Sequence, residues 1–179
     1  FGTFLRYHRG IRSYKLVTTK QRTTQTQCLV YWGPPGSGKS SHAHELGGPT
    51  AFWLPKPRAG GAWWDGYEQQ RTVVIDEFYG WIKWDLLLRL LDRYPLQLET
   101  KGGSTAFLAK DIYITSNKHP SEWYAAIADN SPLMRRIDHC VHMTESMLNA
   151  DEQGQLVVLA SPRFNLTDEQ LREAMNERP

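Results

Sequence analysis

The chain has 179 residues, of which 40% are hydrophobic and 22% charged, so it is long enough for one well-packed domain with a short appendage. No apolar run approaches the ~18 residues that span a bilayer, and two cysteines exclude a disulfide framework. The net charge of +2 is uneven, because residues 1–22 carry six basic and no acidic residues, and it does not by itself indicate nucleic-acid binding.

The N-terminal segment has a helical hydrophobic pattern. Apolar residues recur there at spacings of three and four, which predicts an amphipathic helix over residues 3–17: Phe4, Tyr7, Ile11 and Tyr14. The polar stretch 18–27 is typical of a linker. Because the chain begins with Phe1 rather than Met, we expect it to be a piece of a longer protein.

From residue 28 onward the pattern alternates strands with helices. It predicts, in order, a buried strand at 28–32, a helix at 38–46, strands at 51–54 and 72–75, a helix at 84–94, hairpin strands at 96–100 and 105–108, a strand at 112–115, helices at 122–128 and 132–137, and a strand at 139–143. A strand at 156–159 and a helix capped by Thr167 complete the tail. This order predicts an α/β fold with a central, mainly parallel sheet.

A glycine-rich segment between the first predicted strand and the first of the following helices matches the phosphate-binding pattern Gly-x-x-x-x-Gly-Lys-Ser. Its glycines let backbone N–H groups converge on phosphate oxygens, and the helix N-terminus adds partial positive charge. We expect the lysine to neutralise the β- and γ-phosphates and the serine hydroxyl to ligate Mg²⁺. The pattern therefore predicts ATP with Mg²⁺ on Gly33, Pro34, Pro35, Gly36, Ser37, Gly38, Lys39 and Ser40.

Two carboxylates follow the predicted strand at 72–75. We expect Asp76 to lie near Mg²⁺, directly or through water, and Glu77 to polarise the attacking water as general base. Such a pair is also common as an N-cap or a surface charge, but the phosphate-binding loop before it favours the catalytic interpretation. Asn117 ends the strand that we expect beside the loop's strand, where its amide could hold that water, although a turn asparagine is the more usual role.

Several cations and aromatics are candidates for contacts outside the loop. Of Arg135 and Arg136, one is suited to reach a phosphate bound by a neighbouring subunit, with a surface salt bridge as the alternative. Lys101, on the predicted hairpin turn, is suited to a DNA phosphate, although most exposed turn lysines only solubilise. Trp63 and Trp64 either stack on bases or pack at a core edge.

Two histidine clusters resemble metal sites but do not meet the requirements of one. His42 and His44 alternate on a helix and so point to different faces. His139, Cys140 and His142 have no second ligand pair, so strand packing is the better interpretation.

The motifs together, in their order along the chain, resemble a known family. The phosphate-binding loop is followed by Trp-Trp-Asp-Gly-Tyr (63–67), Val-Ile-Asp-Glu-Phe-Tyr-Gly-Trp (74–81), Asp-Arg-Tyr-Pro-Leu (92–96), Glu-Thr-Lys-Gly-Gly (99–103) and Ile-Thr-Ser-Asn (114–117). From about Tyr31 to Tyr124 this set is similar to the replication initiator proteins of circoviruses and related circular single-stranded DNA viruses.

The resemblance implies a superfamily 3 helicase domain, an AAA+-like ATPase that forms a homo-hexameric ring on single-stranded DNA. It implies 3′-to-5′ movement during rolling-circle replication in the host nucleus. By the same resemblance, each candidate takes a named role: Walker A for Lys39 and Ser40, Walker B for Asp76 and Glu77, the DNA-contacting hairpin for Lys101, the sensor for Asn117, and the arginine finger for Arg136 rather than Arg135. Related helicases often carry a second basic residue two positions after the hairpin lysine, where this chain has Gly103.

The resemblance also divides the chain. It implies a helical oligomerisation segment at 1–22 and an ATPase domain at 23–150, followed by an extension of unassigned role at 151–179. In the full-length protein an N-terminal endonuclease domain would come first. The resemblance implies that the nucleophile of that endonuclease is a tyrosine in the motif Tyr-x-x-Lys. No tyrosine here has lysine three residues later, so we expect no endonuclease or ligase activity from this piece. Because no apolar run is long enough to span a bilayer, we also expect no membrane partner. The competing hypothesis is a non-motor DNA-binding or oligomerisation module in which ATP only controls assembly.

Overall fold

The computed structural model describes residues 7, 10, 14, 21–57 and 61–144. The elements after residue 20, in chain order, are β1 (Gln27–Trp32), α2 (Lys39–Gly47), β2 (Phe52–Trp53), β3 (Thr72–Ile75), α3 (Trp84–Leu90), β4 (Gln97–Thr100), β5 (Gly103–Ala106), β6 (Asp111–Ser116), the 3-10 helix η1 (Pro120–Glu122), α4 (Ser131–Met134) and β7 (His139–His142). Most of the predicted helix at 3–17 lies outside the described residues, as do the strand and helix predicted beyond residue 144.

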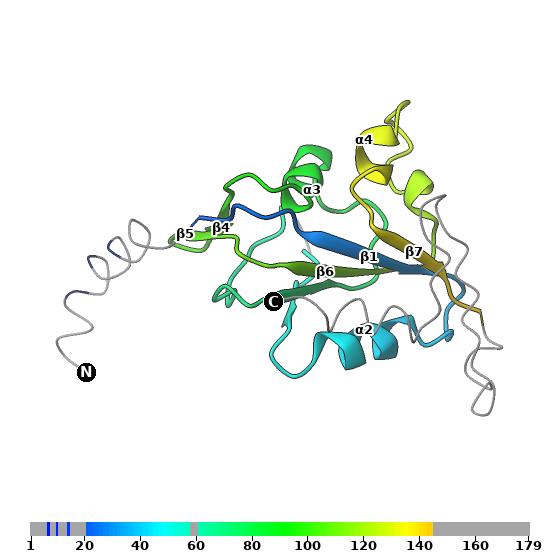
Figure 1. Cartoon of the computed structure of the whole chain (residues 1–179), viewed down its shortest axis with the longest axis horizontal. Helices are drawn as coiled ribbons and strands as arrows, with labels where there is room; N and C mark the ends of the chain where they lie inside the picture. The colour runs from blue at the N-terminus through cyan, green and yellow to red at the C-terminus, as the bar shows by residue number, and fades with distance from the viewer. Residues whose placement is uncertain (1–6, 8–9, 11–13, 15–20, 58–60, 145–179) are drawn as a thin grey trace.

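Five strands form one parallel sheet in the order β2-β3-β6-β1-β7, as Figure 1 shows. The central strand β1 pairs with β6 along its whole length, from Gln27 opposite Asp111 to Trp32 opposite Ser116. On its other side β1 pairs with β7. The predicted parallel sheet is therefore confirmed, and the segments after β1, β3 and β6 leave from the same edge of it.

The sheet is buried on both faces, which explains why its strands read as continuous apolar runs. Successive strand residues point to opposite faces: Val30, Val73 and Ile112 join the core under α3 and α4, whereas Leu29, Val74 and Tyr113 join the core under α2. Figure 1 shows α2 on one side of the sheet and α3 and α4 on the other.

The β4–β5 hairpin forms a separate two-stranded sheet, with Thr100 opposite Gly103 at its tip. Trp64 is buried beneath it among aromatic rings, and its backbone N–H donates to the Glu99 carbonyl at 3.1 Å. The packing interpretation is therefore confirmed for Trp64, whereas Trp63 is 45% exposed.

Three predicted helices are shorter than expected. The one predicted at 132–137 is α4, which ends at Met134, and tertiary contacts explain the other two. The helix predicted at 84–94 ends at Leu90, where side-chain donors from elsewhere take its last carbonyls. The helix predicted at 122–128 does not form beyond η1. Instead, the Trp123 indole N–H is drawn inward to Ser116 Oγ at 3.0 Å, and the Tyr124 hydroxyl donates to the Ile82 carbonyl at 2.6 Å. These long-range bonds turn the chain away from a helical path.

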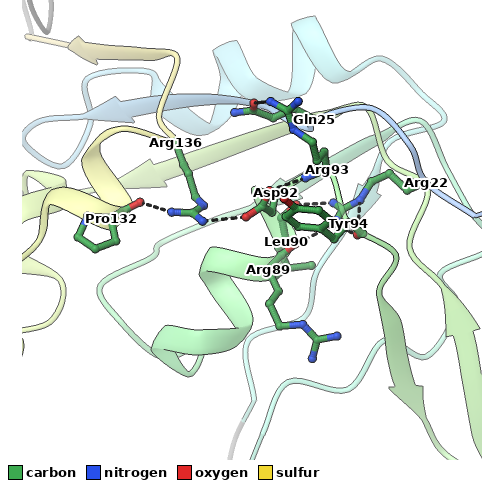
Figure 2. Close-up of polar contacts among 9 residues, drawn as sticks. All are labelled: Arg22, Gln25, Arg89, Leu90, Asp92, Arg93, Tyr94, Pro132 and Arg136. Atoms are coloured by element: carbon green, nitrogen blue, oxygen red, sulfur yellow. Dashed lines mark hydrogen bonds and ion pairs between the residues drawn. The ribbon is translucent and has the colours of Figure 1, made fainter.

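Arg22 supplies the donors at the end of α3 (Figure 2). The residue is 5% exposed, although the sequence places it in a linker. Its guanidinium uses all five N–H groups: Nε and Nη2 donate to the Tyr94 carbonyl, Nη2 also to that of Arg89, and Nη1 to the Leu90 carbonyl and Thr26 Oγ1. The packed domain thus includes Arg22. Over the described residues, no helix has the length and apolar character needed to cross a membrane.

Candidate functional site

The glycine-rich loop runs from the end of β1 to the start of α2, as predicted. Gly33 has a φ of +147°, and a Cβ there would lie 2.0 Å from the Met143 carbonyl oxygen, so only glycine fits. Gly38 caps α2 in the left-handed conformation, with a φ of +82°. The loop is thereby held against β7, with the free N-terminus of α2 at its end.

Lys39 is 7% exposed and folds back over its own loop. Its Nζ donates to the carbonyls of Gly33 at 3.0 Å and Pro34 at 2.6 Å. Burial lowers the pKa of the ammonium from its usual value, and the nearby carboxylates of Asp76 and Glu77 oppose that shift. A phosphate group would compete with these carbonyls for the same cation.

Asp76, at the end of β3, joins the loop to β6. Its Oδ1 accepts hydrogen bonds from Ser40 Oγ at 2.7 Å and from Thr115 Oγ1 at 2.6 Å. Because a carboxylate only accepts, the Ser40 hydroxyl donates and keeps its oxygen lone pairs available. A serine oxygen beside a carboxylate suits a hard cation such as Mg²⁺, which takes few protein ligands and completes its shell with water and phosphate oxygens.

Glu77 and Asn117 complete one pocket with the loop. The pocket has a volume of about 140 Å³ and is lined by Pro35, Gly36, Lys39, Ser40, Glu77, Thr115, Ser116 and Asn117. Glu77 is exposed and has a φ of +48°. The structure thus brings together the predicted loop, Glu77 and Asn117, and it adds Thr115, which sequence reasoning had used only to mark a strand end.

Comparison with known proteins agrees with this geometry. A family model described as RNA helicase matches residues 29–118, about half of the chain. The replication-associated protein of Porcine circovirus 2 is 46% identical over 89% of this chain and 52% of its own length. Those of Porcine circovirus 1 and Human associated cyclovirus 1 are each 48% identical, over 70% and 64% of this chain and 40% and 42% of their own lengths.

The chain belongs to this helicase family. It is a superfamily 3 helicase domain of the circovirus replication-associated type, which confirms the resemblance drawn from the motif order. The five-stranded parallel sheet is the fold expected of such a domain. Membership implies ATP binding and ATPase activity. The chain spans about half the length of these relatives.

In this helicase domain Lys101 lies apart from the pocket, at the tip of the hairpin. Figure 1 shows the hairpin at the end of the molecule where β1 begins, whereas the loop follows the end of β1. The Lys101 side chain is 77% exposed, and its Nζ lies 3.9 Å from Asp65 Oδ2. The Asp65 carboxylate also accepts the Lys101 backbone N–H at 2.7 Å, which fixes the hairpin turn while leaving the ammonium accessible.

Arg136 also lies away from the pocket of its own chain. It precedes β7, near the start of β1, and Figure 2 shows it bound to two groups of its own domain. Its Nη2 contacts Asp92 Oδ2 at 2.7 Å, and its Nη1 donates to the Pro132 carbonyl at 2.8 Å. The hydrogen bond from Arg136 holds the pKa of Asp92 below its usual value. Arg135 is exposed, and its side chain makes no hydrogen bond or ion pair to the residues that the structure describes.

The two histidine clusters are packing features. His42 contacts the Tyr31 ring, and His44 lies near Trp53, so the two imidazoles diverge as predicted. His142 stacks on a tryptophan with ring centroids 4.1 Å apart. Within the described part of the chain, no group of three or more histidine, cysteine, aspartate or glutamate side chains is arranged to hold a metal ion.

Proposed function

We propose that this domain hydrolyses ATP in the pocket between the loop and β6 and uses the energy to move along single-stranded DNA. One observation carries the proposal: side chains suited to phosphate, cation, water and sensing converge from three neighbouring strand ends. They are Lys39, Ser40 with Asp76, Glu77 and Asn117. A structural turn would need none of these groups to share a pocket.

Each side chain then has a distinct task. The loop N–H groups and Lys39 bind the β- and γ-phosphates and offset their charge. Ser40 and Asp76 would hold Mg²⁺, which when bound neutralises charge on the phosphate oxygens. Glu77 accepts the proton of the attacking water, and the Asn117 amide holds that water near the γ-phosphate.

Hydrolysis takes place between subunits of a homo-hexamer. Arg136 lies near the start of β1, whereas the pocket lies beyond the end of β1. It is therefore remote from the pocket of its own chain and available to the pocket of a neighbour. To act as the arginine finger it must leave Asp92, because the ion pair uses Nη2. Arg135 is the competing finger, since its side chain is already exposed. An isolated subunit should turn over slowly, because a finger supplied in trans contributes roughly 10³–10⁵ in rate in related systems.

Lys101 contacts the DNA backbone as a point charge at the hairpin tip. Its exposure and its fixed backbone support this role. Trp63 lies in the segment that supplies Asp65 and is partly exposed, which allows base stacking beside the lysine.

The name of the matched family and the names of the relatives point to different nucleic acids. The family model is described as an RNA helicase, whereas the relatives are named for replication. Single-stranded RNA is therefore the competing substrate in the test.

In the whole protein we propose an endonuclease domain before this one, in keeping with relatives about twice as long. The complete protein would act in rolling-circle replication in the host nucleus. The residues before Arg22 would assemble the ring, and the domain from Arg22 to residue 150 would hydrolyse ATP, with 151–179 as an extension.

The test is ATP turnover by the purified chain, with and without single-stranded DNA or RNA. We expect Lys39→Ala to lose ATP binding, and Glu77→Gln to bind ATP normally while hydrolysis falls by roughly 10²–10⁴-fold. Turnover stimulated by DNA more than by RNA supports the proposed motor. Assembly without turnover under ring-forming conditions would favour the module in which ATP only controls assembly.

A further inference from the structure

Glu77 has a backbone conformation that needs support. Its φ of +48° lies in the left-handed region, which residues other than glycine rarely adopt. Both polar groups of its backbone are bound by side chains: the N–H donates to Thr115 Oγ1 at 2.9 Å, and the carbonyl accepts from the Trp81 indole N–H at 3.1 Å. The strained residue is therefore held from both sides.

The Thr115 hydroxyl has only one consistent orientation of its proton. The Asp76 carboxylate, 2.6 Å away, accepts but cannot donate, so the hydroxyl donates to it. Its lone pair is then left to accept the Glu77 N–H. Thr115 is 1% exposed, and β6 fixes its position by pairing with β1, where it lies opposite Tyr31. One buried hydroxyl thus links the Asp76 carboxylate to the backbone N–H of Glu77.

Trp81 reaches back to Glu77 because of the turn between them. Gly80 has a φ of +98°, and a Cβ at this position would lie 2.1 Å from the Trp123 carbonyl oxygen. The chain can therefore pass close to Trp123 only with glycine here. The Trp81 ring packs edge-on against Phe78 with centroids 5.4 Å apart, which places the indole N–H at the Glu77 carbonyl.

We infer that Thr115 and Trp81 are positioning residues that hold Glu77 in its left-handed conformation, with its carboxylate at the pocket. The inference rests on the proposed role of Glu77 as general base. Without these bonds the Glu77 backbone relaxes toward the right-handed region, and the carboxylate turns away from the site where water attacks. Neither residue needs to contact the nucleotide for this effect.

Three variants test the inference. Thr115→Val keeps the shape but removes the hydroxyl, Thr115→Ser keeps the hydroxyl, and Trp81→Phe removes the indole donor while keeping an aromatic ring beside Phe78. We expect Thr115→Val to lower kcat by roughly 10- to 100-fold, the range for lost supporting contacts, while the KM for ATP changes little. Thr115→Ser should recover most of this loss, and Trp81→Phe should lower kcat without weakening ATP binding.

A second readout does not depend on turnover. Hydrogen exchange of the Glu77 amide, followed by NMR in the nucleotide-free protein, should be fast in Thr115→Val and slow in wild type and Thr115→Ser. Equal kcat for the valine and serine variants, or equal protection of the amide in both, would overturn the inference. If wild type fails to hydrolyse ATP, the proposed function fails, and the exchange measurement still decides whether Thr115 holds Glu77.

Discussion

Replacing Arg22 tests whether the domain's stability depends on a residue from an apparent linker. In Arg22→Met the apolar stem remains, but three backbone carbonyls and Thr26 Oγ1 lose their donors. A hydrogen bond from a charged donor contributes about 1.5–3 kcal/mol. Summing all five bonds would overstate the cost, because water can reach the Tyr94 carbonyl, whose residue is 68% exposed.

The two fully buried bonds, from Nη1 to Leu90 and to Thr26, set the lower bound. They give about 3–6 kcal/mol, to which the guanidinium over the Phe107 ring, 5.1 Å from its centroid, adds about 0.5–1 kcal/mol. Such a loss is a large share of the roughly 5–15 kcal/mol that stabilises a domain.

Urea unfolding followed by tryptophan fluorescence measures this loss. The matched control is Arg93→Met, because Arg93 is exposed and its guanidinium makes one bond to the described residues, at 3.3 Å to the Gln25 side chain. We expect the control to change the free energy of unfolding by less than about 0.5 kcal/mol. A loss for Arg22→Met no larger than that of the control would refute the reasoning.

Three further predictions follow from the structure. Lys101→Ala should abolish stimulation of ATP turnover by DNA and strand unwinding while DNA-free turnover remains, whereas Lys83→Ala, at another exposed lysine, should change neither. Gly33→Ala should lower the free energy of unfolding by at least about 2 kcal/mol, because its Cβ would lie 2.0 Å from a backbone oxygen; Gly36→Ala meets nothing within 4 Å and should cost less in the same urea titration. Burial raises the pKa of Cys140 to about 12, so iodoacetamide at pH 8 should label it about 1,000-fold more slowly in the folded protein than in urea.

Patterns local in the sequence predicted most of the fold. Strands buried on both faces leave continuous apolar runs, so β1, β3 and β6 were found within one or two residues. The phosphate-binding loop was found because its glycines and lysine must occur at fixed spacing. The hairpin was found from its turn composition, although β5 begins at Gly103, nearer the tip than predicted.

Contacts between distant segments could not be predicted. Arg22 looks like any basic linker residue until the end of α3, 67–72 residues later, supplies its acceptors. Likewise, no pattern near Thr115 predicts that its hydroxyl joins Asp76 and Glu77. Its position just before Ser116-Asn117, at the end of a strand, indicated only that it lies near the site. Nor does any local pattern connect Arg136 to Asp92, the carboxylate that its guanidinium contacts in this structure.

The central claim is that ATP is hydrolysed between subunits, and mixing two inactive variants tests it most directly. Glu77→Gln lacks the base and Arg136→Ala lacks the finger, so neither should turn over ATP alone. In mixed rings about one interface in four pairs an intact Glu77 with an intact Arg136 from the neighbour. The account predicts that mixing restores ATP turnover. Co-assembled rings that remain inactive, both in this mixture and with Arg135→Ala in place of Arg136→Ala, would contradict it.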